Sequence, residues 1–195
     1  MAGPDAGKWR AAVEDEYKSL QSRGVFELVD LPKGRNAIGH KWVLAFKRDA
    51  AGNIVRYKAR LVAQGFRQKY GVDFTETYSP VAGLNIVRLL VAAAMVKGWL
   101  VHQADYVTAY LNGDLYDEAY MTQPEGFIVK GQESKVWKLR KSLYGLKQSG
   151  RCWNQTMNSR LSKAGLQRHS SCGVSILAVS GRNSRWSAYS LMTTQ

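Results

Sequence analysis

Apolar residues recur at helical spacing in three segments of the chain. In the first segment, apolar residues follow one another at intervals of four, four and three positions, which places them on one face of a helix. These residues are Trp9, Val13, Tyr17 and Leu20. The pattern predicts helices over residues 8–22, 84–98 and 143–165, and the last of them begins near Gly145.

Shorter apolar runs, rich in β-branched and aromatic residues, predict strands. The two longest runs, 41–48 and 54–63, are separated by Asp49-Ala-Ala-Gly-Asn53, a sequence typical of a hairpin loop. Further strands are predicted over residues 26–31, 99–105, 121–125 and 134–139, with a turn or short helix through Tyr110 and Gly113. From about residue 167 the periodicity fades, and apolar residues stand isolated among Ser, Gly, Arg and Asn.

The composition indicates a protein that folds around a core. Hydrophobic residues make up 45% of the 195 residues, with six Trp and ten Tyr, which excludes a disordered basic tail. The longest mostly apolar stretch, 86–101, contains Arg88 and Lys97 and is shorter than the ~20 residues of a membrane span. Cys152 and Cys172 lack the spacing of a zinc site, and the N-terminus lacks the layout of a signal peptide. We therefore expect an intracellular protein without a membrane segment.

The charge of the chain is strongly positive and unevenly distributed. The sequence holds 28 Lys and Arg against 15 Asp and Glu, a formal net charge of +13. Glu133 is the last acidic residue, and eleven Lys and Arg follow it. An excess of this kind favours an acidic partner, such as a nucleic acid.

Asp105 is the first candidate for chemistry, because it ends an apolar strand in the sequence Gln103-Ala-Asp105-Tyr-Val-Thr-Ala-Tyr110. A carboxylate in this place can bind Mg²⁺ directly through oxygen, as phosphoryl-transfer sites require. An Asp that precedes a turn or helix more commonly caps that helix. The residues alone leave both interpretations open.

Two basic regions are candidates for binding nucleic acid. The hairpin over residues 41–67 carries Lys and Arg on both arms, which either neutralise phosphates or keep an exposed edge strand soluble. The pattern does not distinguish these two interpretations. In residues 138–153 basic residues alternate with aromatic ones, as in grooves that follow phosphates and stack bases. A basic helix face is the alternative, but the lack of later acidic residues favours nucleic acid.

Six blocks of the sequence stand in a fixed order over most of the chain. They are Lys41-Trp-Val43, Arg56-Tyr-Lys-Ala-Arg-Leu-Val-Ala-Gln-Gly-Phe66, Gly71-Val-Asp-Phe74 with Glu76-Thr-Tyr-Ser-Pro-Val81, Gln103-Ala-Asp105 with Ala109-Tyr-Leu-Asn-Gly113, Tyr120-Met121 with Gln123-Pro-Glu-Gly-Phe127, and Lys141-Ser-Leu-Tyr-Gly-Leu-Lys-Gln148. Together these blocks resemble a copia-type retrotransposon reverse transcriptase. The resemblance runs from about Trp9 to Gly165.

The resemblance implies an α+β fold, a right-hand polymerase fragment with fingers over an incomplete palm sheet. It divides the chain into an N-terminal helix or extension (1–24), a reverse transcriptase domain (25–166) and an aberrant tail (167–195) that is disordered or out of frame. Within the domain, fingers would span about 25–98 and a partial palm about 99–166. The resemblance also implies DNA synthesis from deoxynucleoside triphosphates on an RNA or DNA template-primer, with two Mg²⁺ ions.

Residues matching the family blocks take on implied roles. Asp105 matches the first metal-binding, catalytic aspartate. The residues implied in nucleotide binding are Lys58, Arg60, Tyr110 and Gln148, and the ring of Tyr110 would close off the 2′ side of the sugar. The residues implied in contacting nucleic acid are Tyr144, Gly145, Lys147 and Arg151.

One part of the family pattern is absent from this sequence, the aromatic-x-Asp-Asp turn that supplies the remaining metal ligands. If the codon of Leu191 ends in G, the frame in which that G is a first base encodes Asp-Asp across Leu191 to Thr193. We therefore hypothesise a frameshift or a wrongly drawn gene near residues 167–174, with a tail translated out of frame. The nucleotide sequence tests this hypothesis, which fails if no alternative frame carries Asp-Asp there.

Two-metal phosphoryl transfer needs at least two carboxylates, and Asp105 supplies one. The sequence therefore predicts a fragment of a retrotransposon reverse transcriptase that lacks polymerase activity on its own. The alternative is a non-catalytic nucleic-acid-binding module derived from a retroelement. A further possibility is a fragment that fails to fold, because a palm sheet without its central hairpin leaves strand edges uncovered.

Overall fold

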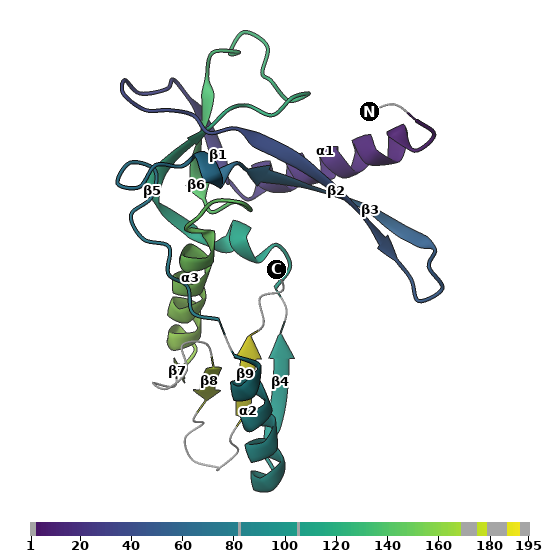
Figure 1. The fold of residues 1–195 in the computed structure, drawn as a ribbon, viewed down its shortest axis with the longest axis vertical. Coiled ribbons are helices and arrows are strands. Elements are labelled where there is room, and N and C mark those ends of the chain that lie inside the picture. The colour runs from purple at the N-terminus through teal and green to yellow at the C-terminus, as the bar shows by residue number, and fades with distance from the viewer. Residues whose placement is uncertain (1–2, 82, 105, 169–174, 179–186, 192–195) are drawn as a thin grey trace.

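The computed structural model describes residues 3–81, 83–104, 106–168, 175–178 and 187–191 (Figure 1). Its helices are α1 (Ala6–Ser22), α2 (Leu84–Lys97) and α3 (Ser149–Lys163), with short 3-10 helices η1 (Gly65–Arg67) and η2 (Ala109–Asn112). Its strands are β1 (Phe26–Val29), β2 (His40–Arg48), β3 (Ile54–Ala63), β4 (Leu100–Ala104), β5 (Asp114–Met121), β6 (Val136–Lys141), β7 (Leu166–Arg168), β8 (Ser175–Ala178) and β9 (Ser187–Leu191). This mixture of helices and sheets agrees with the expected α+β class.

The described strands form three sheets. One has the order β1-β6-β5 with antiparallel neighbours, and a second is the antiparallel hairpin of β2 and β3. The third has the order β4-β9-β8-β7, in which β4 and β9 run parallel. In Figure 1 the hairpin projects sideways from the three-stranded sheet, and α3 leads down from that sheet toward α2 and β4.

Local sequence patterns place several of these elements correctly. The predicted helices over 8–22 and 84–98 are α1 and α2, and Gly98 ends α2 in the left-handed conformation with a φ of 65°. The predicted hairpin is confirmed as β2 and β3. In its loop, the carboxylate of Asp49 accepts hydrogen bonds from the backbone N–H of Ala51 and of Asn53, at 3.0 and 2.8 Å.

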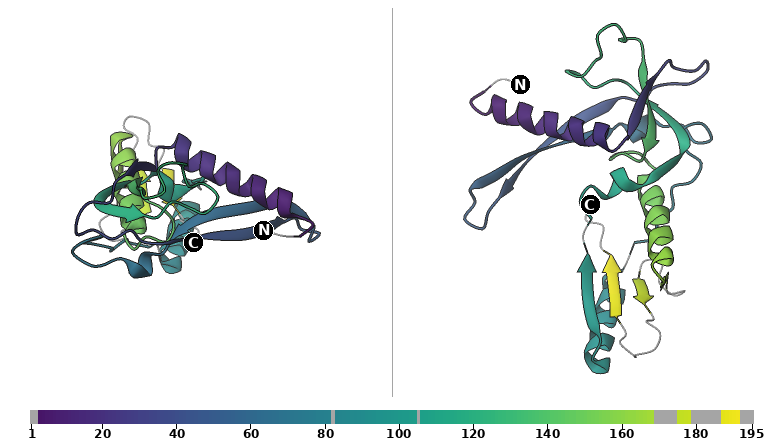
Figure 2. Two further views of the ribbon diagram at one scale, coloured as in Figure 1. Left: turned by 90° about the horizontal axis from the view of Figure 1, so that it is seen from above. Right: turned by 180° about the vertical axis from the view of Figure 1, so that it is seen from behind.

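Helix α1 runs beside the projecting hairpin and packs on β3 (Figure 2). The ring of Trp9 contacts those of Phe46 and Tyr57 with centroids 4.9 and 4.8 Å apart. The Lys8 ammonium lies 5.2 Å from the centre of the Tyr57 ring. Because an isolated two-stranded hairpin is only marginally stable in water, these contacts with α1 are what support it.

The core lies where α1, the three-stranded sheet and the end of β3 meet. Its buried members are Leu20, Val25, Ile38, Leu61, Ala63, Leu111, Ala119, Met121, Trp137, Leu139, Leu143 and Leu146. The rings of Phe26 and Trp137 stack with centroids 3.5 Å apart, and Tyr17 stacks on Phe127 at 4.1 Å. Each fully buried aliphatic side chain of this kind contributes ~1.5–3 kcal/mol to folding. The core therefore fixes the helix α1 against the sheet.

The strand predicted over 121–125 is wrong, because the strand in this region is β5 and ends at Met121. Residues of β5 pair with β6. The strand alternates Asp114, Tyr116 and Glu118 on its exposed face, so its first half contains no apolar run. Gln123 lies beyond the strand and holds the following loop. Its side-chain nitrogen donates to the carbonyls of Gln132 and Lys135 at 2.7 and 2.9 Å.

The predicted start of the third helix near Gly145 is also wrong. Helix α3 begins at Ser149, and residues 143–148 form a turn instead. Gly145 has a φ of 90°, which is incompatible with a right-handed helix. A contact between distant parts of the chain holds this turn, because the Tyr144 carbonyl accepts a hydrogen bond from the N–H of Ala63 at 2.8 Å.

The tail after residue 166 contains described strands. Strand β8 pairs with β7 and β9, and β9 lies alongside β4 with Leu191 opposite Ala104. Each of these strands forms within a sheet that includes β4, which the tail sequence does not reveal. The other residues of the tail lie outside the described residues.

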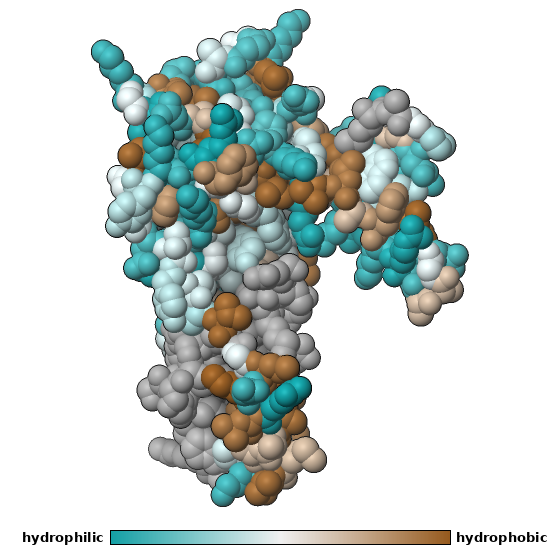
Figure 3. Space-filling model, viewed as in Figure 1, coloured by the Kyte–Doolittle hydropathy of each residue, from teal (hydrophilic) through white to brown (hydrophobic). Residues whose placement is uncertain are grey.

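Helix α2 exposes an unusual number of apolar side chains, which gather in the lower part of Figure 3. The exposed ones are Leu84, Leu89, Val91, Met95 and Val96, and the last two are 80% and 84% exposed. Among the described residues, no helix is both long and apolar enough to cross a membrane.

Candidate nucleotide and nucleic-acid cleft

A cleft of about 640 Å³ lies between α1, β3, the η2 region and the turn over residues 143–148. One part of its lining is basic and comes from the hairpin, namely Lys47, Arg56, Lys58 and Arg60. Another part is aromatic and comes from the segments after β4 and β6, namely Tyr106, Tyr110, Tyr144 and Trp153. Helix α1 contributes Asp15 and Glu16, and Arg23 directly follows the helix.

The cleft brings together half of the residues that the family resemblance implicated in nucleotide and nucleic-acid contacts. Lys58 and Arg60 come from β3, Tyr110 from η2 and Tyr144 from the turn. The Arg60 guanidinium lies 5.2 Å from the centre of the Tyr144 ring, and the ring of Tyr110 meets that of Tyr144 edge-on at 5.2 Å. Burial raises the pKa of the Tyr144 phenol, so the ring faces Arg60 as a neutral group.

The basic part of the lining follows from the two-residue period of a strand. Arg56, Lys58 and Arg60 alternate along β3, and side chains that alternate point to the same face. Partial burial lowers the pKa of Lys58, and the charges of Arg60 and Arg56 lower it further. The described residues place no carboxylate within ion-pair distance of any of these three bases. Unpaired cations at this density attract anions.

Two glycines let β3 approach the turn closely enough to form the cleft. A Cβ atom on Gly145 would lie 2.2 Å from the carbonyl oxygen of Ala63, far inside normal contact. A Cβ atom on Gly65 would lie 2.0 Å from the carbonyl oxygen of Gly145. The role of Gly145 in this structure is therefore to place Tyr144 beside Arg60 by allowing backbone contact.

Gln148 and Lys147 do not line the cleft. Gln148 is fully buried, and its side-chain nitrogen donates to the Asp73 carbonyl at 2.9 Å while its oxygen accepts from Gln68 at 3.0 Å. Gln68 also accepts from the backbone N–H of Lys147 at 2.9 Å, and the Lys147 ammonium lies 4.8 Å from the centre of the Phe74 ring. These residues join the turn to the segment after β3, a structural role that sequence reasoning missed.

Arg151 lines a second, smaller cleft of about 370 Å³. Its guanidinium lies 3.8 Å from the carboxylate of Glu76, an ion pair that is partly exposed. Cys152 lines the same cleft, and burial raises the pKa of its thiol to about 11. Because the thiol is protonated and buried, Cys152 is not a nucleophile at neutral pH.

The family of the protein follows from comparison with known proteins. The sequence profile of the family described as "Reverse transcriptase (RNA-dependent DNA polymerase)" matches residues 23–183. The chain belongs to this family. It is 45% identical over 159 residues to the Retrovirus-related Pol polyprotein from transposon TNT 1-94 of Nicotiana tabacum, which covers 82% of this chain and 12% of the relative.

Two further relatives support the assignment of this reverse transcriptase domain. The Retrovirus-related Pol polyprotein from transposon RE1 of Arabidopsis thaliana is 40% identical over 147 residues, which are 75% of this chain and 10% of the relative. The Transposon Ty1-H Gag-Pol polyprotein of Saccharomyces cerevisiae is 32% identical over 134 residues, which are 66% of this chain and 7% of the relative. The chain therefore spans about a tenth of the length of these polyproteins. No solved structure matches it.

The predicted catalytic residue of this reverse transcriptase domain, Asp105, lies outside the described residues. Strand β4 ends at Ala104, next to it in the sequence. Within the described part of the chain, no group of three His, Cys, Asp or Glu residues lies close enough to hold a metal ion. The described donors therefore do not fit a two-Mg²⁺ centre.

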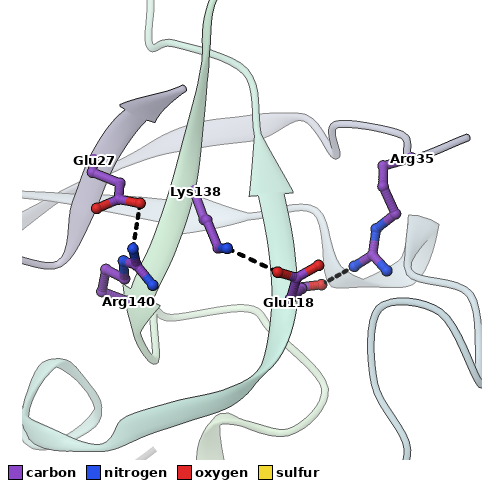
Figure 4. Close-up of polar contacts among 5 residues, drawn as sticks. All are labelled: Glu27, Arg35, Glu118, Lys138 and Arg140. Atoms are coloured by element: carbon purple, nitrogen blue, oxygen red, sulfur yellow. Dashed lines mark hydrogen bonds and ion pairs between the residues drawn. The ribbon is translucent and has the colours of Figure 1, made fainter. Parts of the chain in front are cut away.

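The basic stretch at residues 138–153 of the reverse transcriptase domain is divided by the fold (Figure 4). Lys138 pairs with Glu118 at 2.8 Å and Arg140 with Glu27 at 2.5 Å, both on the three-stranded sheet. Arg35 donates to the backbone carbonyl of Glu118. Acidic residues from earlier in the chain thus neutralise these two bases. The lack of acidic residues after Glu133 therefore does not leave Lys138 and Arg140 unpaired, which corrects the prediction made from the sequence. In the cleft, by contrast, Lys58 and Arg60 have no ion-pair partner among the described residues.

Proposed function

We propose that the cleft of this reverse transcriptase domain binds the phosphates of a deoxynucleoside triphosphate and of a template-primer. The observation that supports this most is the meeting of unpaired Lys58 and Arg60 with the rings of Tyr110 and Tyr144 in one cleft. Cations neutralise phosphate, and an arginine does so with two parallel hydrogen bonds. Aromatic rings nearby suit a sugar and a base, which carry apolar faces.

Within this proposal, α1 is an N-terminal extension, the hairpin and α2 belong to the fingers (about 25–98), and β4 and α3 belong to part of a palm (about 99–166). Tyr110 would stand against the 2′ side of the sugar, where its ring favours deoxynucleotides. Because Gln148 is buried, it would act on the nucleotide indirectly, by holding the turn that carries Tyr144. Arg151 would contact nucleic acid only outside the main cleft, since it lines the smaller one.

We further propose that this chain binds nucleic acid without polymerising. Two-metal phosphoryl transfer needs several carboxylates around the reacting phosphate, and no Asp or Glu follows Glu133 in the sequence. Asp105 would be a single ligand in place of a set. A chain of this kind is the alternative considered above, a non-catalytic nucleic-acid-binding module derived from a retroelement.

Filter binding of a DNA template-primer, measured against salt concentration, tests this proposal. We expect binding that weakens steeply with salt, because each neutralised phosphate releases counterions, and no nucleotide incorporation with Mg²⁺ or Mn²⁺. Absence of binding by a folded chain would refute the proposed function. Incorporation that disappears in Asp105→Asn would refute the claim that the chain does not polymerise.

A further inference from the structure

Four cations of the cleft stand in a regular row on one face of the hairpin. Arg56, Lys58 and Arg60 alternate along β3, which places their side chains on the same face. Lys47 of β2 is paired directly with Arg56, so its side chain lies on that face as well. All four residues line the cleft, and the described residues give none of them an ion-pair partner. We call these four residues the cation row.

The pairing of Lys47 with Arg56 works against the stability of the hairpin. Side chains directly opposite each other in an antiparallel pair have Cβ atoms about 4.5–5.5 Å apart, and like charges in this arrangement are destabilising. The hairpin gains its support from its other face, where Phe46 and Tyr57 pack against Trp9 of α1. On the cleft face both cations are exposed, so an anion that binds between them would remove their repulsion.

The spacing of the cation row distinguishes between possible anions. A strand rises about 3.3 Å per residue, so Lys58 lies about 6.6 Å from each of its two neighbours in β3, and Arg56 lies about 13 Å from Arg60. Neighbouring phosphates of an extended nucleic-acid strand are separated by a whole sugar and lie at a comparable distance. The phosphates of a triphosphate are joined through single oxygen atoms and lie much closer together. A triphosphate therefore reaches only part of the row, whereas a strand can follow all of it.

The aromatic lining of the cleft suits the bases of such a strand. It contains two edge-on pairs, Tyr110 with Tyr144 at 5.2 Å and Tyr106 with Trp153 at 5.1 Å between ring centroids. The guanidinium of Arg60 lies 5.2 Å from the centre of the Tyr144 ring, so the cation row and the rings meet inside the cleft. Grooves that bind single-stranded nucleic acid combine these two features, because cations follow the phosphates while aromatic side chains stack on the bases.

We propose that the cation row binds consecutive phosphates of one extended nucleic-acid strand, whose bases lie against the aromatic lining. This inference rests on the proposed function, because it concerns the same cleft, and it names the single strand as the ligand that fills the row. A triphosphate occupies only the Arg60 end, where Tyr110 and Tyr144 meet. Asp15 and Glu16 line the cleft from α1 and repel the phosphates toward the row.

The variant Arg56→Gln tests the end of the row that lies away from Tyr144. Titration calorimetry at several salt concentrations gives dissociation constants for three probes, namely a deoxythymidine octanucleotide, the corresponding dinucleotide and inorganic tripolyphosphate. We expect the variant to bind the octanucleotide about three- to tenfold more weakly, with a salt slope lower by about 0.7, the value for one phosphate of a single strand. Binding of the dinucleotide and of tripolyphosphate should change by less than about twofold, because neither spans the row.

Two further measurements separate binding from folding. Arg48→Gln removes the same charge from the same hairpin but outside the cleft, where the Arg48 guanidinium lies 5.6 Å from the centre of the Phe46 ring. This variant should bind the octanucleotide within about twofold of the wild type. In thermal unfolding, Arg56→Gln should be at least as stable as the wild type, because it removes the repulsion from Lys47. A merely structural role of Arg56 would lower stability instead.

The outcomes distinguish this inference from the proposed function. If Arg56→Gln weakens binding of tripolyphosphate as much as binding of the octanucleotide, the row is a site for compact phosphates and the inference is wrong, while the proposed function stands. The inference is equally wrong if the wild type binds and Arg56→Gln changes none of the dissociation constants. If the folded wild type binds none of the three probes, the proposed function is wrong and the inference fails with it.

Discussion

Replacing Gly145 by alanine is expected to lower the free energy of unfolding by about 3–5 kcal/mol, a very large effect for adding one methyl group. Two causes combine. Gly145 has a φ of 90°, where a residue with a Cβ atom is strained. The new Cβ would also lie 2.2 Å from the Ala63 carbonyl oxygen and 2.7 Å from a methyl carbon of Val62. The chain can relieve this overlap only by moving the turn away from β3.

The matched control is Gly126→Ala. Gly126 has a φ of 85°, close to that of Gly145, but a Cβ atom there would meet nothing within 4 Å. This variant carries the backbone strain alone, and we expect it to lower stability by about 1–2 kcal/mol. The difference between the two variants thus isolates the contact between the turn and β3.

Urea unfolding followed by circular dichroism measures both variants. Equal losses of stability would contradict the close contact between Gly145 and Ala63. We also expect Gly145→Ala to weaken phosphate binding under conditions where it remains folded, because displacement of the turn separates Tyr144 from Arg60. Gly126→Ala should bind phosphate as the wild type does, since Gly126 does not line the cleft.

Replacing Arg60 by alanine is expected to weaken binding of a DNA template-primer about tenfold at ~0.1 M salt and to lower the salt slope by about 1. The slope falls because one phosphate contact fewer releases one counterion fewer. The affinity falls further because Tyr144 loses the cation that faces its ring at 5.2 Å. Filter binding at several salt concentrations gives both quantities.

Two variants control for the loss of charge and of shape. Arg160→Ala removes an exposed arginine in the last turn of α3, outside the cleft, and should change affinity by less than about twofold. Arg60→Lys keeps the charge but loses the planar group that binds phosphate with two hydrogen bonds and faces Tyr144. Its affinity for the template-primer should therefore lie between those of Arg60→Ala and Arg160→Ala. If Arg160→Ala weakens binding as much as Arg60→Ala, the cleft is not the binding site.

Features that residues close together in the chain decide are visible in the sequence, and features that depend on distant contacts are not. Helix α2 ends at Gly98 because a glycine adopts the left-handed cap without strain, a local effect that the sequence reveals. The start of α3 depends on a hydrogen bond between Ala63 and Tyr144, which are far apart in the chain. Local patterns therefore predicted α2 correctly and placed the start of α3 too early.

The candidate site divides in the same way. The family blocks pointed to Lys58, Arg60, Tyr110 and Tyr144, and the fold brings these residues into one cleft. They also pointed to Gln148, whose side chain is buried in an amide network with Gln68. Nothing in the sequence marks Glu16 as a cleft residue, because it lies on a helix whose apolar pattern defines only the packed face. The burial of its Oε1 atom without a hydrogen-bond partner among the described residues is a property of the three-dimensional structure.

The ordered blocks of the sequence are enough to assign the family, and its strong positive charge favours an acidic partner. The sequence also determines that no carboxylate side chain follows Glu133. The tertiary structure alone decided which bases are available for that partner. Arg140 is paired with Glu27, 113 positions away, whereas Arg60 has no carboxylate within ion-pair distance among the described residues. The physical reason is that Coulomb energy depends on distance through space, and separation along the chain does not determine that distance.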